Sequence, residues 1–278
     1  MGAGHTHRVD VRGGRLQVRI DGPLGAPWLV FSNSLATDLT LWAPQVAAFA
    51  LRYRMLRWDY RGHGGSDPVA GAGDPATGAI DPATGGRDAD ALADDLLAVM
   101  DEAGIGRACH VGTSMGALAG LAAAARAPRR IDRLVLCGAR LASSPQAAAD
   151  LARRADLALA AGMAALAEPT LAKWFGASGV SPALRERIAA MIRATDAGSF
   201  AAHARGMGAY DLVSALEAIQ VPVLLAAGAG DAGIAADFAA RAARDPRLAC
   251  EIIPRAGHLP NVEAPDAFNR MLGRFVAA

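Results

Sequence analysis

The sequence predicts an α/β fold: a mostly parallel central sheet with helices on both faces and an inserted helical cap. Three observations predict it. Short apolar runs alternate with helical segments, which is typical of parallel strands joined by helices. Strand signals stop between about residues 141 and 214, where Ala, Leu, Arg and Met recur at helical spacing. Finally, a strand that ends in Gly-x-Ser-x-Gly runs directly into a helix at residues 109–117.

The first half of the chain is expected to supply five strands and two helices. Residues 9–11 and 15–20 alternate apolar and polar side chains around Gly13-Gly14, which predicts a hairpin. The histidines at positions 5 and 7 precede it, and an irregular start is expected there rather than a metal site. The remaining elements are listed in chain order: strands over 28–31 and 55–58, an amphipathic helix over 89–103, a strand over 107–111 and a small-residue helix over 117–125.

The second half is expected to return to the sheet after the cap. Apolar runs predict strands over 134–137, 221–226 and 250–253, with helices over 234–243 and 265–276. The predicted division is therefore a core of residues 1–140 and 215–278 around a cap of residues 141–214.

One segment of the predicted core is unlike the rest. Within residues 70–87 the run Asp-Pro-Ala-Thr-Gly at 74–78 recurs at 81–85. Such a Gly/Pro/Asp composition does not bury an apolar core, so a flexible surface loop is expected, with an active-site flap as the alternative.

Composition limits the classes of partner. The formal net charge is +1, so no strong field favours nucleic acid or an anionic membrane. No apolar run reaches the ~18 residues of a membrane span, and the N-terminus lacks an apolar signal core. Three scattered cysteines show neither metal-ligand spacing nor a disulfide framework, which indicates a reducing compartment and a cytoplasmic location. A small molecule is the expected partner, and the oligomeric state stays open.

Ser114 is the candidate nucleophile. It is the central residue of Gly112-Thr113-Ser114-Met115-Gly116, between a predicted strand and a predicted helix. A serine on such a turn is held in a strained, exposed position, and small residues two before and two after it let strand and helix pass closely. By itself the pattern is weak, because short glycine motifs recur by chance.

The nucleophile needs a base to take its proton and an acid to orient that base. Asp231 follows the strand predicted over 221–226, and His258 follows the strand predicted over 250–253. Both are therefore expected at carboxyl ends of the sheet, where sites of open α/β sheets gather. Each alone fits an ordinary loop residue; together, in the order Ser, Asp, His, they favour a catalytic triad. Asp237 and Asp245 are poorer acids, because they fall within a helix and at its end.

An oxyanion hole would need backbone N–H groups aimed at the developing negative charge. One is expected from Met115, the residue after the nucleophile. The other is expected from the loop after the strand at 28–31, where Leu35 is the candidate.

Several segments resemble the α/β-hydrolase superfamily and, within it, the 3-oxoadipate enol-lactonases. The loop Ser32-Asn33-Ser34-Leu35-Ala36-Thr37-Asp38 is similar to the Ser-Asn-Ser-Leu-Gly-Thr-Asp of that family. The same holds for Arg57-Trp58-Asp59-Tyr60-Arg61-Gly62-His63-Gly64 and for Gly257-His258-Leu259-Pro260-Asn261-Val262-Glu263. The likeness covers residues 10–140 and 215–278, while in the cap Lys173-Trp174-Phe175 matches best. Thr113, Ala117 and Gly230 depart from the family pattern.

The resemblance implies a cofactor-free hydrolase that opens an enol-lactone formed in bacterial aromatic catabolism, giving 3-oxoadipate. It carries over Ser114 as nucleophile, His258 as base and Asp231 as orienting acid. A lactone that bears a carboxylate would favour a cation in its pocket, for which Arg140 is the candidate. Trp42 and Trp174 are candidate pocket residues, with plain core packing as the alternative for each.

Other functions fit the same residues. Within the fold, the alternatives are a carboxylesterase, another lactonase or a cofactor-free perhydrolase acting on a different small ester. A C–C hydrolase of ring-cleavage products shares the triad but needs a pocket for a dienol. A non-catalytic relative that binds a small ligand is a further alternative, although binding alone does not require all three residues.

Overall fold

The computed structural model describes residues 4–71, 88–176 and 179–277. Their centre is an eight-stranded sheet with the order β1-β2-β4-β3-β5-β6-β7-β8. β1 and β2 form an antiparallel hairpin, and β2 pairs antiparallel with β4. The other six strands, β4, β3, β5, β6, β7 and β8, are parallel to their neighbours in that order. The strands are β1 (His5–Val11), β2 (Gly14–Asp21), β3 (Trp28–Ser32), β4 (Arg54–Trp58), β5 (Ala108–Thr113), β6 (Ile131–Cys137), β7 (Val223–Gly228) and β8 (Leu248–Ile253).

The hairpin is longer than the sequence indicates. Its first strand starts at His5 and pairs with β2 through His5↔Ile20, so the irregular start expected at His5 and His7 is wrong. Residues 5–8 have side chains that do not predict a strand, but their backbone groups hydrogen-bond to β2, and this pairing extends the strand.

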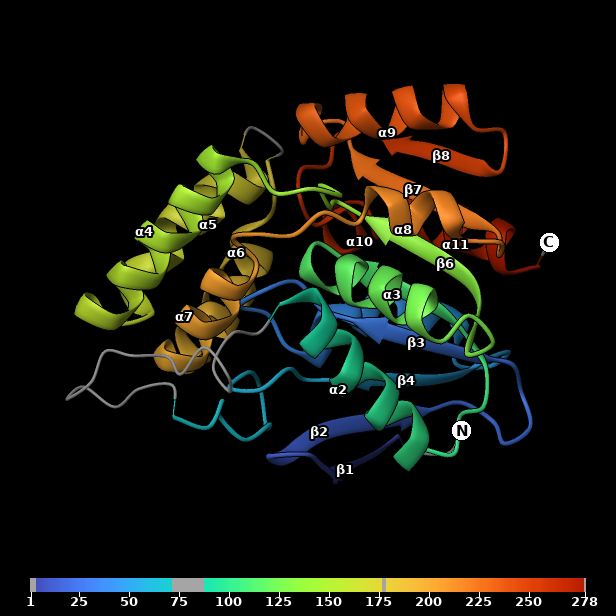
Figure 1. The fold of residues 1–278 in the computed structure, drawn as a ribbon, viewed down its shortest axis with the longest axis horizontal. Coiled ribbons are helices and arrows are strands. Elements are labelled where there is room, and N and C mark those ends of the chain that lie inside the picture. The colour runs from blue at the N-terminus through green and yellow to red at the C-terminus, as the bar shows by residue number, and fades with distance from the viewer. Residues whose placement is uncertain (1–3, 72–87, 177–178, 278) are drawn as a thin grey trace.

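Helices cover both faces of the sheet. α2 and α8 flank α3 in front of the strands, and α11 lies behind them, where it contacts α1 (Figure 1). α9 packs on β7 and β8. The helices outside the β6–β7 connection are η1 (Leu39–Trp42), α1 (Ala43–Phe49), α2 (Ala89–Glu102), α3 (Met115–Arg126), α9 (Ala232–Arg244), α10 (Pro260–Glu263) and α11 (Pro265–Ala277).

The described part of the long connection between β6 and β7 contains five helices joined by short loops. Four of its helices gather at one end of the sheet, while α8 returns to lie beside α3 (Figure 1). An isolated bridge between Ala142 and Asp211 ties its two ends together, close to the predicted limits 141 and 214. Its helices are α4 (Pro145–Ala161), α5 (Ala164–Phe175), α6 (Pro182–Ala194), α7 (Ala197–Gly206) and α8 (Val213–Ala218). The repeat-containing segment 70–87 lies outside the described residues, apart from its first two.

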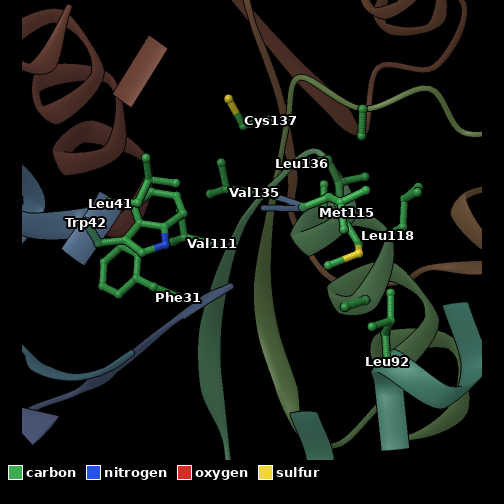
Figure 2. Close-up of a cluster of buried hydrophobic side chains, with 14 of the residues drawn as sticks. Phe31, Leu41, Trp42, Leu92, Val111, Met115, Leu118, Val135, Leu136 and Cys137 are labelled. Carbon is green, nitrogen blue, oxygen red and sulfur yellow. The ribbon is translucent and has the colours of Figure 1, made fainter. Parts of the chain in front are cut away.

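The core fills both sides of the parallel strands with apolar side chains. β5 and β7 are buried along their whole length, β7 as its unbroken apolar run predicts and β5 although it carries the polar His110 and Thr113. In Figure 2, Phe31 and Trp42 lie on one side of the sheet at β5, while Leu118 and Leu92 lie on the other. This two-sided burial fixes the strand ends from which the loops of the site emerge.

Among the described residues, no helix is both long enough and apolar enough to cross a membrane.

Candidate active site

The turn between β5 and α3, which we call the elbow, holds Ser114 in a strained conformation. Its φ is 53° and its ψ is −118°, in a region that few non-glycine residues enter. A Cβ placed on Gly112 would come 2.2 Å from the carbonyl oxygen of Gly116. A Cβ on Gly116 would come 2.2 Å from the carbonyl oxygen of Ser32. Because both contacts are with backbone, glycine is required on each side of the serine.

His258 and Asp231 form a hydrogen-bonded pair at the ends of neighbouring strands. Asp231 follows β7 and His258 follows β8, and His258 Nδ1 lies 2.7 Å from Asp231 Oδ2. An Nδ1 proton donated to this carboxylate leaves Nε2 as the basic nitrogen. The other acids considered from the sequence are engaged elsewhere: Asp237 pairs with Arg241 on α9, and Asp245 pairs with Arg247.

The backbone around His258 is held from two sides. The Glu263 carboxylate accepts hydrogen bonds from Gly257 N–H at 2.7 Å and from Leu259 N–H at 2.8 Å. The N–H of His258 itself donates to the carbonyl of Trp174, at the end of α5, at 2.8 Å. The Trp174 ring also stacks on the His258 ring, with centroids 5.7 Å apart. An inserted helix therefore helps to position the histidine, a role the sequence did not reveal.

The loop after β3 supplies the predicted oxyanion donors. Leu35 N–H and Met115 N–H donate to no acceptor among the described residues. Ala36 takes a φ of 63° and donates its N–H to His63 Nε2 at 3.0 Å. Thr37 donates both its N–H and its hydroxyl to the carbonyl of Ser34. These bonds fix the loop while leaving the Leu35 N–H available.

His63 acts on this loop as a neutral imidazole. Its Nδ1 donates to the carbonyl of Arg61 at 2.9 Å, which leaves Nε2 as the acceptor for Ala36. Burial lowers the pKa of His63 to about 4, so the ring keeps this tautomer near neutral pH. The sequence placed His63 in a motif but gave it no role, because its partner is 27 residues away.

Ser114, the His258–Asp231 pair and the predicted oxyanion donors all line one cavity of about 640 Å³. Seven of the eight residues predicted for the site line it: Leu35, Ser114, Met115, Arg140, Trp174, Asp231 and His258. The volume falls within the usual range of small-molecule sites, about 300–1,000 Å³.

Trp42 does not line the cavity, and the prediction that it lines the pocket is wrong. Its side chain is fully buried, donates Nε1–H to Asn33 Oδ1 at 2.9 Å and packs 4.9 Å from the Phe31 ring (Figure 2). The alternative of plain core packing is the one the structure adopts, because η1 turns the indole toward the sheet. Asn33 then links Trp42 to the carbonyl of Trp58 through its amide nitrogen.

Most of the charged residues that line the cavity come from α4 and α5. Lys173 and Arg153 both bond to Asp150, at 2.8 and 3.1 Å. Arg140 and Arg154 line the same cavity, and within the described residues neither has a carboxylate within 4.0 Å. Burial lowers the pKa of the Arg154 guanidinium, an effect that Asp150 opposes. Arg140, between β6 and α4, and Arg154, on α4, therefore offer two cations to an anionic ligand.

A family model described as the alpha/beta hydrolase fold matches residues 27–265. The chain belongs to the α/β-hydrolase family. This α/β-hydrolase is 30% identical to 3-oxoadipate enol-lactonase 2 of Acinetobacter baylyi over 257 residues, 89% of this chain and 88% of the relative. It is also 30% identical to a protein of Caulobacter sp. (strain K31) named as a candidate carbamate hydrolase, over 90% of each chain.

Solved structures agree with this assignment. The enol-lactonase from Burkholderia xenovorans LB400 superposes with a TM-score of 0.82 and 34% identity, covering 98% of this chain and 100% of that one. The predicted α/β-hydrolase fold and the resemblance to enol-lactonases are thus confirmed. The names of these relatives refer to different bonds, an enol-lactone ester in two of them and a carbamate in the third. The comparisons therefore identify this chain as a hydrolase but do not identify its substrate.

Proposed function

We propose that this α/β-hydrolase opens a small lactone that bears a carboxylate, with 3-oxoadipate enol-lactone, giving 3-oxoadipate, as the first candidate. One observation carries the proposal. A single cavity is lined by the strained Ser114, the His258–Asp231 pair and the two loops that bear the Leu35 and Met115 N–H groups. The similarity to enol-lactonases of two bacteria supports the lactone among the possible esters.

The chemistry would proceed in two acyl-transfer steps. His258 Nε2 takes the Ser114 proton as Oγ attacks the lactone carbonyl, and the carbonyl electron pair moves onto its oxygen. The N–H groups of Leu35 and Met115 stabilise that oxyanion, while Asp231 stabilises the imidazolium. The ring C–O bond then breaks, and the enolate becomes a ketone after protonation. Water activated by His258 finally releases the acid and restores Ser114.

Recognition of the substrate carboxylate is assigned to Arg140 and Arg154. Both residues line the cavity, and neither guanidinium has a carboxylate within 4.0 Å among the described residues. A charge-assisted bond to a carboxylate in a partly dehydrated cavity is stronger than one in water. The proposed reaction needs no cofactor.

The cytoplasm is the proposed location of this reaction. Cys109 and Cys137 are buried free thiols and Cys250 is a half-buried one, which agrees with a reducing compartment.

A carboxylesterase acting on a larger acidic ester is the second candidate, because the cavity is roomy. A lactone of about ten non-hydrogen atoms would fill at most about 300 Å³, if each atom took the share of a liquid water molecule. The cavity is about 640 Å³. The spare volume lies within reach of a longer acyl or alcohol group.

A substrate panel tests the proposal. Purified protein is assayed with the enol-lactone, with neutral and carboxylate-bearing p-nitrophenyl esters, and with a dienol from ring cleavage. The proposal expects the highest kcat/KM on the enol-lactone. Faster turnover of the larger acidic esters would select the second candidate, and turnover of the dienol alone would indicate C–C hydrolysis. Failure of a fluorophosphonate to label Ser114 would favour a non-catalytic binding protein.

A further inference from the structure

The loop between β3 and η1 contains a buried hydroxyl that the mechanism above does not use. Ser34 is fully buried, and its Oγ has no hydrogen-bond partner among the described residues. A hydroxyl removed from water without a partner costs stability, and native proteins keep few such groups. Within the described part of the chain, Ser34 alone combines such a hydroxyl with a place in the cavity lining.

The position of Ser34 relates this hydroxyl to the oxyanion site. Ser34 directly precedes Leu35, and both line the cavity with Ser114 and Met115. The start of α3 lies against the same segment, since a Cβ on Gly116 would come 2.2 Å from the Ser32 carbonyl oxygen. The loop and the elbow therefore meet at Ser32 and Gly116, a few residues from the Leu35 and Met115 N–H groups.

The loop holds the Ser34 backbone in place. Its carbonyl accepts from Thr37 N–H at 3.2 Å and from Thr37 Oγ1 at 2.8 Å. On its other side, Asn33 is fixed through Trp58 and Trp42. With the backbone fixed, the hydroxyl has only its side-chain torsion and its proton rotation left to adjust. Preorganisation of this kind makes a donor effective in a transition state.

We propose that the Ser34 hydroxyl is a catalytic residue that donates a third hydrogen bond to the oxyanion, beside the N–H groups of Leu35 and Met115. The inference rests on the proposed serine-hydrolase function. In the step concerned, the Ser114 proton passes to His258, the new Oγ–C bond forms, and the carbonyl electron pair moves onto oxygen. Ser34 keeps its own proton throughout and binds the oxygen most strongly when it carries the charge.

Ser32 provides a matched control two residues earlier in the same segment. It is equally buried, but its Oγ lies 2.8 Å from His110 Nε2 and accepts from Trp58 Nε1 at 2.9 Å. It is not among the residues that line the cavity. The hydroxyl of Ser32 is thus bonded within the core, whereas the hydroxyl of Ser34 lacks a partner in the described residues and belongs to a residue that lines the cavity.

The test compares Ser34→Ala with Ser32→Ala on the best substrate of the panel. Ser34→Ala is expected to lower kcat by about 10- to 100-fold with KM changed less than about twofold, and to leave the urea midpoint unchanged or raised. Ser32→Ala is expected to lower the midpoint and keep kcat within about twofold. Affinity for a boronic acid that mimics the tetrahedral intermediate should fall in Ser34→Ala by the same factor as kcat/KM.

Three results would overturn the inference: wild-type kcat in Ser34→Ala, a rise in KM alone, or a loss of kcat matched by a loss of stability. Should Ser32→Ala fail to fold, the boronic acid affinity of Ser34→Ala decides the question by itself. Failure of the proposed serine-hydrolase chemistry has a different signature, since wild-type protein would then turn over no ester or lactone. In that case this inference falls with it, whereas an active wild type beside an equally active Ser34→Ala overturns only the role of Ser34.

Discussion

The two walls of the cavity are built in different ways. On the core side, backbone meets backbone: Gly112 and Gly116 let β5, α3 and the loop after β3 approach to distances that any Cβ would block. On the inserted side, α4 and α5 contribute long charged side chains, and Lys173 and Arg153 are more than half exposed. Substitutions on the core side would therefore disturb backbone contacts, while single side chains on the inserted side can be replaced without such contacts being lost.

This difference assigns two tasks to two kinds of structure. Positioning a nucleophile and N–H donors requires fixed geometry, which close backbone contacts in a buried core supply. Choosing a substrate requires adjustable charge and volume, which exposed helix side chains supply. His258 lies between them, because its pair with Asp231 belongs to the core whereas the Trp174 carbonyl and ring belong to the insert.

The largest expected effect comes from Ser114, the proposed nucleophile on the core wall. Ser114→Ala should lower kcat by at least about 10³-fold, since removal of a member of the proposed triad leaves only binding and oxyanion stabilisation. Steady-state kinetics measures this, and an unchanged circular dichroism spectrum serves as the control. Activity close to wild type would show that the chemistry does not depend on the elbow.

The next effect tests the backbone approach itself. Gly116→Ala should lower the free energy of unfolding by about 3 kcal/mol, because the new methyl group meets the Ser32 carbonyl, which has no room to move. Gly106→Ala is the matched control, since a Cβ there meets nothing within 4 Å, and a change below about 0.5 kcal/mol is expected. Urea denaturation measures both. Equal free energies of unfolding for the two variants would mean that the close backbone contact at Gly116 is not required for the fold.

The boundary between the walls can be probed by pH through His63. Its ring lies 5.3 Å from that of His203 on α7, and burial lowers its pKa to about 4 from the ordinary 6.5. The stabilisation from neutral His63 is therefore complete above pH 6.5 and is lost as the pH falls toward 4, because the unfolded chain binds the proton more readily. The stability advantage of wild type over His63→Gln should shrink across this window by roughly 2 kcal/mol.

Urea titrations of both proteins between pH 4 and pH 7 measure that difference. Subtracting the two curves cancels groups common to both, including Asp59, whose pKa burial raises to about 7. A difference that stays constant with pH would show that His63 does not titrate in this range.

The smallest effect concerns the cavity cation that directly precedes the inserted helices, Arg140. Arg140→Gln should raise KM about tenfold for the carboxylate-bearing lactone and leave kcat nearly unchanged, because the lost bond is present in ground and transition states alike. A neutral ester should show no change in KM. Arg185→Gln is the control, since Arg185 pairs with Glu168 and does not line the cavity. The same rise in KM for the neutral ester would point to a general distortion of the pocket.

Much of the fold could be predicted from the sequence because strands and helices are coded locally. The ends of the predicted elements lie within four residues of those in the structure. The largest difference, at His5, arises because β1 gains its pairing from β2. Trp42 was misplaced for a related reason, since periodicity does not tell whether an indole faces a cavity or the neighbouring Phe31. Glu263, His63 and Ser34 carried no assigned role, because each acts through contacts that only the folded loops create.

The sequence by itself determined the order of the candidate catalytic residues along the chain. A serine on a Gly-x-Ser-x-Gly turn comes first, and an aspartate and a histidine follow, each after an apolar run. These features are local, so residue type and spacing specify them. Only the tertiary structure decided that β7 and β8 bring Asp231 and His258 to 2.7 Å, that α5 holds His258, and that Ser34 lies buried without a partner among the described residues at the cavity. These outcomes depend on packing between segments distant in the chain, which spacing alone does not specify.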